Sequence, residues 1–460
     1  MDSAVLSAAT IHELGEQFTA MLRQVARDLA ETDLAAGERQ LQAAIRPVLG
    51  QVMTAVVAAR VAGQGLRPRC PTCQGRLHLV DAQRPRSLQG LVGDYTVRRP
   101  YYRCPHCRAS QTPFDASVGL GRGSLSPALS RVACRLGIDA SFPEAADLLA
   151  ETLGVVVSDE GIRRITEGIG AVAEAEQQTA MERAAVGLEP AGTPASPTLL
   201  VTVDGVMVPE VDGWHECKIG VAAPLGPAVR SDPETGRQCL LPGPPSYGAG
   251  LEAAERFWQR VYAEACRRGL GTPALRLVVV VGDGADWIWR WAAAFLGIGQ
   301  VEVVEIVDFY HAVEHLWGVA NAVFGVGSPA AAAWATRLKA QLYRHGTGPV
   351  LTALGALAGE DEGASAVVRK ALAYFGEHAA RMDYPTFVAR QLPIGSGMVE
   401  SSCKTLIQTR EKGAGMRWSP AGAQAVASLR AVHRSQRWEH FWQSQPQRRR
   451  PPVFPRRQAA

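Results

Sequence analysis

The spacing of apolar residues predicts a helical start to the chain. In residues 1–66, apolar side chains such as Phe18, Leu22 and Val25 recur at helical spacing, without the alternation of a strand. We expect a helical N-terminal region that either pairs with a second chain or packs on its own protein. The spacing leaves both roles open.

A second helical pattern follows in residues 126–186. Residues 143–153 and 159–168 read as two short helices, and Ser158 is a good capping residue for the second. This segment resembles a DNA-binding helix-turn-helix, in which Arg163 and Arg164 would lie on the reading helix. A plain helical hairpin fits the same spacing. Residues 187–197, rich in Pro, Ala and Gly, are typical of a linker.

After this linker, the spacing of apolar residues indicates strands and helices that alternate along the chain. The order is strand, strand, a third strand, helix, buried strand, helix and strand, at residues 199–208, 216–223, 239–241, 251–268, 275–281, 286–296 and 301–307. That order matches an α/β RNase H-like domain. Its first part spans residues 198–314.

The remaining residues predict an all-α insertion and a closing helix. Residues 315–392 are Ala- and Leu-rich with helical spacing, and Trp317, Trp334 and Leu338 are candidate core residues. Residues 393–440 then supply the closing helix of the RNase H-like domain, and residues 441–460 form a basic tail.

The charge of the chain is unevenly distributed. The formal net charge of +4 over 460 residues conceals a C-terminal stretch, from Cys403 onward, with twelve Lys and Arg against two acids. A second basic island, between Arg67 and Arg108, has nine Arg against two Asp. Two such islands indicate a polyanionic partner. No apolar run approaches the ~18 residues of a membrane span, so we expect a cytoplasmic protein without a membrane segment.

Two Cys-x-x-Cys pairs predict a structural zinc site. The residues between them alternate as strands do, and a hairpin there would bring four thiolates around one Zn²⁺. A redox pair would not explain why the motif occurs twice. The expected zinc ribbon spans residues 67–125, and its ligands are Cys70, Cys73, Cys104 and Cys107.

Three carboxylates carry the candidate chemistry. Asp204 interrupts the first apolar strand of the α/β region, and Asp283 follows the buried strand directly. A carboxylate in an apolar strand is unfavourable unless it is paired or coordinates a cation. Glu400 begins a helix after a glycine-containing loop. We expect the three to bind two Mg²⁺ (or Mn²⁺) ions for in-line phosphodiester displacement.

Simpler roles exist for some of these residues. Glu400 could pair with Lys404 one helical turn later, and Asp283 could cap a helix. Asp308 also ends a strand and competes with Asp283 for the metal. We assign Asp283 as the ligand, and Asp308 with His311 as a supporting catalytic pair, although His311 could simply pack against its helical neighbours.

Basic residues continue along the chain after Glu400. Around Trp418 they are spaced so that the closing helix could also hold the phosphodiester backbone of DNA. A solvated basic face is the alternative. The candidates are Lys404, Arg410, Lys412 and Arg417.

Several motifs together resemble the ISKra-type insertion-sequence transposases. They are Thr202-Val-Asp204-Gly205, Gly282-Asp283-Gly284-Ala285, Asp308-Phe-Tyr-His311, Pro393-Ile-Gly-Ser-Gly-Met-Val-Glu400-Ser and Arg410-Glu-Lys412-Gly-Ala-Gly-Met-Arg417-Trp418. With the zinc ribbon the resemblance covers most of the chain. It implies a DDE-type transposase related to Mutator-like transposases, in which Asp308 and His311 match an Asp/Cys-x-x-His pair. The basic tail departs from the simplest pattern.

The resemblance implies metal-dependent cleavage and joining of DNA. The partners would be the terminal inverted repeats of an element, a target DNA and further copies of the chain in a synaptic complex, with the protein associated with the nucleoid. Two alternatives stay open: a non-catalytic DNA-binding protein, whether domesticated or regulatory, and an RNase H-like nuclease or resolvase.

Overall fold

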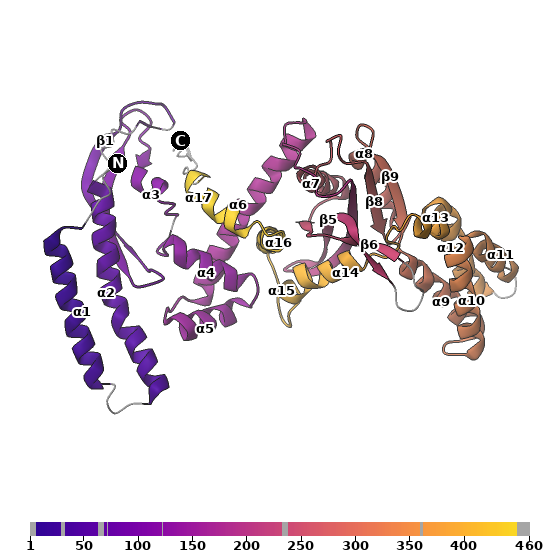
Figure 1. Ribbon diagram of the computed structural model, residues 1–460, viewed down its shortest axis with the longest axis horizontal. Helices are drawn as coiled ribbons and strands as arrows, with labels where there is room; N and C mark the ends of the chain where they lie inside the picture. Colours follow the sequence, from indigo (N-terminus) through magenta and orange to yellow (C-terminus); the bar gives the residue numbers. More distant parts are fainter. Residues whose placement is uncertain are drawn as a thin grey trace. The chain divides into compact units, whose positions relative to one another are not determined.

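The computed structural model describes residues 6–28, 33–62, 69–70, 72–121, 123–231, 238–358 and 362–448 (Figure 1). Arg67 of the first basic island and residues 449–460 of the basic tail lie outside these ranges. The chain forms two compact units: Met1–Thr166 with Trp438–Ala460, and Glu167–Arg437. The structure confirms a mixed α/β protein with a helical N-terminal region.

The first unit begins with the expected helices. These are α1 (Ala8–Asp28) and α2 (Leu34–Ala62), which lie side by side (Figure 1). A small antiparallel sheet follows, in which β2 pairs with both of its neighbours. Its strands are β1 (His78–Leu88), β2 (Tyr95–Arg103) and β3 (Ser110–Gln111).

Helix α2 is the one described helix with the length and apolar composition of a membrane span. The core helix of a soluble protein and a signal sequence near the N-terminus share this length and composition, so these features alone do not assign α2 to a membrane. The guanidinium of Arg46, within α2, donates to the carbonyls of Leu91 (2.9 Å) and Gly90 (3.2 Å), and Thr54 Oγ1 accepts from the amide of Thr96 at 3.2 Å. Polar contacts therefore join α2 to the β1–β2 hairpin.

Serine caps organise the helices that follow. Ser126, Ser141 and Ser158 each accept a hydrogen bond from the backbone N–H three residues later, which satisfies a donor that the first helical turn leaves free. The helices of this unit after the hairpin are α3 (Pro113–Ser117), α4 (Pro127–Gly137), α5 (Phe142–Leu153), the start of α6 (Asp159–Ala185) and α17 (Trp438–Arg448). Helix α6 has 27 residues, so the short second helix expected to end at Gly168 is wrong in length.

The second unit is built on a mixed sheet. Strand β4 pairs antiparallel with β5 and parallel with β8, and β8 pairs parallel with β9. Both β6 and β7 pair antiparallel with β5. The strands are β4 (Thr198–Glu210), β5 (Gly213–Ser231), β6 (Gln238–Pro242), β7 (Ser246–Gly250), β8 (Leu277–Gly282) and β9 (Glu302–Val307).

Helices cover this sheet and continue its core. The valines of β8 are fully buried together with Trp334 and Leu338 of the expected insertion, so these helices share one core with the sheet. Trp317, in contrast, is 38% exposed, and its expected core position is wrong. The helices are α7 (Ala254–Arg267), α8 (Asp286–Leu296), α9 (Phe309–Phe324), α10 (Pro329–His345), α11 (Gly348–Leu357), α12 (Glu362–Glu377), η2 (Ala379–Met382) and α13 (Tyr384–Ala389).

The expected linker at residues 187–197 is held against the second unit. The amide of Gly192 donates to Cys266 O (2.9 Å), Ser196 Oγ donates to Leu225 O, and Pro197 O accepts from the amide of Arg276 (2.8 Å). These bonds fix the segment along the sheet, so it is not a free tether.

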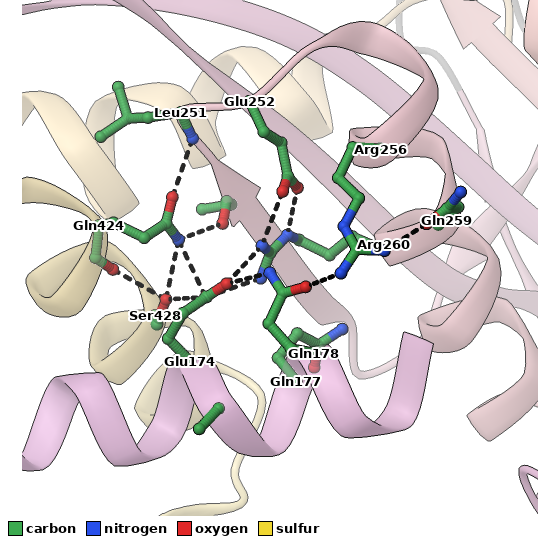
Figure 2. A network of polar contacts seen from close by, with 12 residues as sticks. Glu174, Gln177, Gln178, Leu251, Glu252, Arg256, Gln259, Arg260, Gln424 and Ser428 are labelled. Carbon is green, nitrogen blue, oxygen red and sulfur yellow. Dashed lines mark hydrogen bonds and ion pairs between the residues drawn. The ribbon is translucent and has the colours of Figure 1, made fainter. Parts of the chain in front are cut away.

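The last part of the unit is a helical segment and α16 (Pro420–Arg434). The segment comprises α14 (Gly397–Ser402), a π-helical stretch η3 (Cys403–Gln408) and α15 (Thr409–Glu411). Figure 2 shows how α6, α7 and α16 are joined: Glu174, Arg260, Gln424 and Ser428 meet in one polar network.

Candidate functional site

The sheet places Asp204 and Asp283 at equivalent positions on neighbouring strands. The last paired residues of β4 and β8 are Thr202 and Val281, and each aspartate lies two residues further on. Both side chains are partly buried. Each has one oxygen held by a nearby backbone N–H: Gly205 N donates to Asp204 Oδ1 (2.7 Å) and Ala285 N to Asp283 Oδ1 (2.9 Å).

Electrostatic interactions indicate that Glu400, the third carboxylate, lies near these two aspartates. Burial raises the pKa of Asp204, and the negative charges of Asp283 and Glu400 raise it further, against the lowering effect of hydrogen bonds from Gly205 and Cys403. Like charges raise a pKa only when they lie close enough to interact. The structure therefore gathers the three predicted carboxylates in one region.

Glu400 lies on α14, next to a Ser and a Cys that the sequence analysis did not single out. Ser396 Oγ donates to Glu400 Oε1 (2.9 Å), and Cys403 Sγ, one turn after Glu400, donates to Asp204 Oδ2 (3.4 Å). Cys403 begins the π-helical stretch, and such turns often occur at functional sites. Buried Arg430 satisfies carbonyls freed there, at Thr405 and Leu406.

Asp308 has a different environment from Asp283. It is 1% exposed, and its Oδ1 accepts from the backbone N–H groups of Tyr310 (2.6 Å) and His311 (3.0 Å). Its Oδ2 accepts from the N–H of Ser396. Asp308 thus caps α9 and fixes the loop that leads to Glu400. These contacts favour a positioning role over a metal-binding one.

The imidazole of His311 does not contact the Asp308 carboxylate in the described structure. Its Nδ1 lies 3.4 Å from Glu314 Oε2, and its ring meets that of His315 edge to face. The next ring, Tyr374, stacks on His315 at 4.0 Å. Burial lowers the pKa of His315, and its interaction with His311 lowers it further, against the raising effect of Glu314 and Asp283. His311 therefore begins a row of three rings.

Tyr374, from α12 in the expected insertion, reaches the carboxylate region. Its hydroxyl donates to the backbone carbonyl of Asp283 (3.0 Å). Gly284 has φ +103°, and a Cβ there would meet the Tyr374 ring, so this turn requires glycine. Burial and the charge of Asp283 raise the Tyr374 pKa. The distance in sequence between Tyr374 and Asp283 explains why no local pattern identified it.

The donor set of the carboxylates suits hard divalent cations. Among the described residues, however, the ligand atoms of Asp204, Asp283 and Glu400 do not all lie within 4.8 Å of one another. Three carboxylates repel each other, and two ions ~4 Å apart spread their ligands more widely than one ion does. The hydrogen bonds to Asp204, Asp283 and Glu400 fix the orientation of one oxygen of each carboxylate.

The four predicted zinc ligands form a compact cluster that could hold a metal such as zinc. Cys70 Sγ lies 3.5 Å from Cys107 Sγ, and Cys73 Sγ lies 3.4 Å from Cys104 Sγ and 3.9 Å from Cys107 Sγ. For Zn–S bonds of ~2.3 Å, a tetrahedron has S···S edges of about 3.8 Å. All four are free thiols.

The two cysteine turns share one backbone design. Cys70 N donates to Gly75 O (2.8 Å) and Cys104 N to Ala109 O (2.9 Å). The residue after the second cysteine of each pair has a positive φ: Gln74 at 55° and Arg108 at 56°. Equivalent turns at both ends of a hairpin present two sulfurs each, which is the arrangement that a closed site needs.

The candidate DNA-binding residues differ in exposure. Both Arg163 and Arg164 pair with Glu160, at 2.8 and 3.7 Å, and their side chains are 43% and 76% exposed. Lys404, Lys412 and Arg417 are exposed, and Lys412 Nζ lies over the Trp214 ring (5.6 Å). Arg410 is only 1% exposed and lies over Trp418, which argues against a phosphate contact for this residue.

Comparison of the sequence with protein-family models and with curated proteins finds no match. The function is therefore inferred from the residues and their geometry.

Proposed function

We propose that the chain is a DDE-type DNA transposase whose catalytic domain is the second unit. The observation that carries the proposal is the gathering of three carboxylates: Asp204 lies within β4 just past its parallel pairing with β8, Asp283 directly follows β8, and Glu400 lies on α14. Supporting it, β7, β5, β4, β8 and β9 follow one another in the order of an RNase H-like sheet, antiparallel first and then parallel.

The three carboxylates would hold two Mg²⁺ or Mn²⁺ ions. The chemistry that such ions supply is activation of the attacking oxygen and stabilisation of the leaving one, with water attacking in cleavage and a DNA 3′-hydroxyl in joining. The protein residues bind and orient. Asp308 holds the loop before Glu400, and the exposed Lys404, Lys412 and Arg417 contact phosphates.

The first unit supports DNA binding in this proposal. The cysteine cluster binds structural Zn²⁺ as a zinc ribbon, and the capped start of α6 presents Arg164 to DNA. The DNA partners are the terminal inverted repeats of an element and a target, bridged by several copies of the chain. This would place the protein at the nucleoid.

The test is a metal-dependent strand-transfer assay with labelled DNA that carries the inverted repeats flanking the gene. Asp204→Asn, Asp283→Asn and Glu400→Gln should each lower joining at least about 100-fold, the scale of a lost electrostatic contribution in an active site. Asp286→Asn, an exposed carboxylate near Asp283, is the matched control and should join as the wild type does.

Three outcomes would contradict the proposal. If Asp204→Asn still joins DNA, the carboxylates do not carry out the reaction. A wild-type chain that binds the repeats but neither cuts nor joins them is a non-catalytic DNA-binding protein, and one that cuts without joining is a nuclease. Circular dichroism of each variant shows whether a loss of joining reflects a loss of fold.

A further inference from the structure

A second group of metal-binding side chains lies at the turn between β4 and β5. Glu210 pairs with Gly213 across a turn formed by Val211 and Asp212, and His215 lies opposite Val208 on the next strand. Because side chains alternate along a strand, Glu210 and His215 share one face of this hairpin. Asp212 in the turn lies beside them.

The three side chains converge on one nitrogen. His215 Nε2 lies 3.0 Å from Asp212 Oδ1 and 3.9 Å from Glu210 Oε2. Nitrogen and carboxylate ligands bind Zn²⁺ at about 2.0–2.2 Å, so neighbouring ligand atoms are about 3.0–3.6 Å apart in a tetrahedral or octahedral site. All three ligand atoms here lie within 4.8 Å of one another, so small side-chain movements complete such a site.

Glu210 supplies a second and independent observation. It is only 4% exposed, and its Oε1 has no hydrogen-bond partner in the described structure. A buried carboxylate without a donor is unfavourable unless it is protonated or coordinates a cation. Burial raises the Glu210 pKa, the interaction with His215 lowers it, and the interaction with Asp212 raises it.

The surrounding charges do not neutralise Glu210. Buried Glu411 lies close enough for Glu210 to raise its pKa, so the two carboxyl groups are neighbours. The nearby guanidinium groups of Arg410 and Arg430 act on Glu411, whose pKa they lower.

We propose that Glu210, Asp212 and His215 bind one divalent transition-metal ion of the zinc class. An imidazole with two carboxylates suits Zn²⁺ and its neighbours, whereas Mg²⁺ prefers oxygen ligands and water. This site is separate from the cysteine cluster and from the carboxylates of the proposed active site, and its existence does not depend on transposase activity.

The ion would stabilise the tip of the hairpin whose first strand carries Asp204. The tip is already joined to the segment after α15: Val211 N donates to Trp418 O (3.0 Å), and Trp418 N donates to Pro209 O (3.1 Å). Metal bound across the turn would fix Val211 and hence this junction. The exposed Lys412 and Arg417 lie on the same segment.

The test counts zinc in the full-length chain by elemental analysis after dialysis. The wild type should retain about two zinc ions per chain and His215→Ala about one, with Asp212→Asn as a second exposed ligand variant. The matched control is His12→Ala, because His12 also pairs with a carboxylate, Glu16 at 3.4 Å, but has no third ligand. It should retain both ions.

The zinc content of Asp283→Asn distinguishes this site from the proposed active site. If that variant loses the second zinc ion, the ion binds at the catalytic carboxylates and the proposal is overturned. A wild type with a single zinc ion, or a His215→Ala variant that retains both, also overturns it. Loss in His12→Ala equal to that in His215→Ala would show adventitious binding to surface histidines. Because the His215 side chain is 48% exposed, its replacement by Ala should leave the protein folded.

Discussion

Replacing Glu174 by Ala should destabilise the second unit, because it leaves a buried charge partly unpaired. Arg260 is 1% exposed, and its Nη1 and Nη2 donate to the two oxygens of Glu174 at 2.9 and 2.8 Å (Figure 2). Glu252 accepts two further bonds, at 2.8 and 3.2 Å, and would remain. Glu174 also accepts from Ser428 and Gln424, which connects α16 to this pair.

Breaking a buried ion pair on one side costs about 3–5 kcal/mol. Since Glu252 still neutralises Arg260 in Glu174→Ala, we expect the lower end, about 3 kcal/mol of unfolding free energy. At about 2 °C per kcal/mol for a unit of this size, the Tm should fall by about 6 °C. Glu174→Gln keeps the size of the side chain and one acceptor oxygen but loses the second acceptor and the charge, and should cost less than Glu174→Ala.

The effect should depend on pH in a defined direction. Burial raises the pKa of Glu174, but the hydrogen bonds and charge of Arg260 outweigh it and hold the pKa below the ordinary 4.5. A depressed carboxyl pKa gives stability that is present above the unfolded value and is lost as the pH falls through the folded value. The difference between wild type and Glu174→Ala should therefore shrink below about pH 4.5.

Urea unfolding followed by tryptophan fluorescence measures this, since eight of the ten tryptophans belong to the second unit. Glu182→Ala, an exposed glutamate on the same helix, is the control and should change stability by less than about 0.5 kcal/mol. A Glu174→Ala variant as stable as this control would refute the reasoning, because Arg260 would then not need its partner.

Two further predictions concern a buried carboxyl and the cysteine cluster. Burial raises the Glu411 pKa to about 8 despite Arg430 and Arg410, so the folded state retains a proton between pH 4.5 and about 8 that the unfolded state releases. The free energy of unfolding should therefore fall as the pH rises through this window. Glu411→Gln should flatten the measured dependence of stability on pH. An unchanged profile contradicts this. Cys107→Ser should remove one equivalent of zinc and lower the Tm of the first unit, measured by circular dichroism. The control Cys134→Ser should leave the zinc content unchanged. Equal zinc contents in the two variants would exclude the cysteine cluster as the zinc site.

Strong periodicity made most of the α/β unit predictable. The continuous valines of β8 and the neighbouring strands β4 and β9 were expected within a few residues, because buried strands have a strong sequence pattern, whereas β5 continues eight residues beyond its expected end. Strand β7 was missed, since its sequence Ser-Tyr-Gly-Ala-Gly has no alternation of large apolar residues. Gly248 of β7 leaves room for the Arg260 side chain, and a Cβ there would lie 3.0 Å from Arg260 Cγ.

The candidate site was predictable only where a residue's own segment revealed it. Asp204 and Asp283 stand out because carboxylates interrupt or end apolar strands, and neighbouring strands bring them together. Tyr374 lies on a helix with no unusual pattern, and only the tertiary structure places its hydroxyl on the carbonyl of Asp283. Contacts between segments far apart in sequence leave no local periodicity to read.

Local sequence patterns also could not decide whether Asp283 or Asp308 is the metal ligand. Both residues end parallel strands, so their sequence patterns are alike, and only their hydrogen bonds distinguish them. Three backbone N–H groups occupy the oxygens of Asp308. A metal ion at Asp308 would have to displace donors that cap α9 and hold the loop before Glu400, and those donors would then be left buried and unsatisfied. Asp283 holds a single backbone donor, Ala285 N, on Oδ1, and in the contacts described it does not hold the loop before Glu400, so a cation can bind its other oxygen without disrupting that loop.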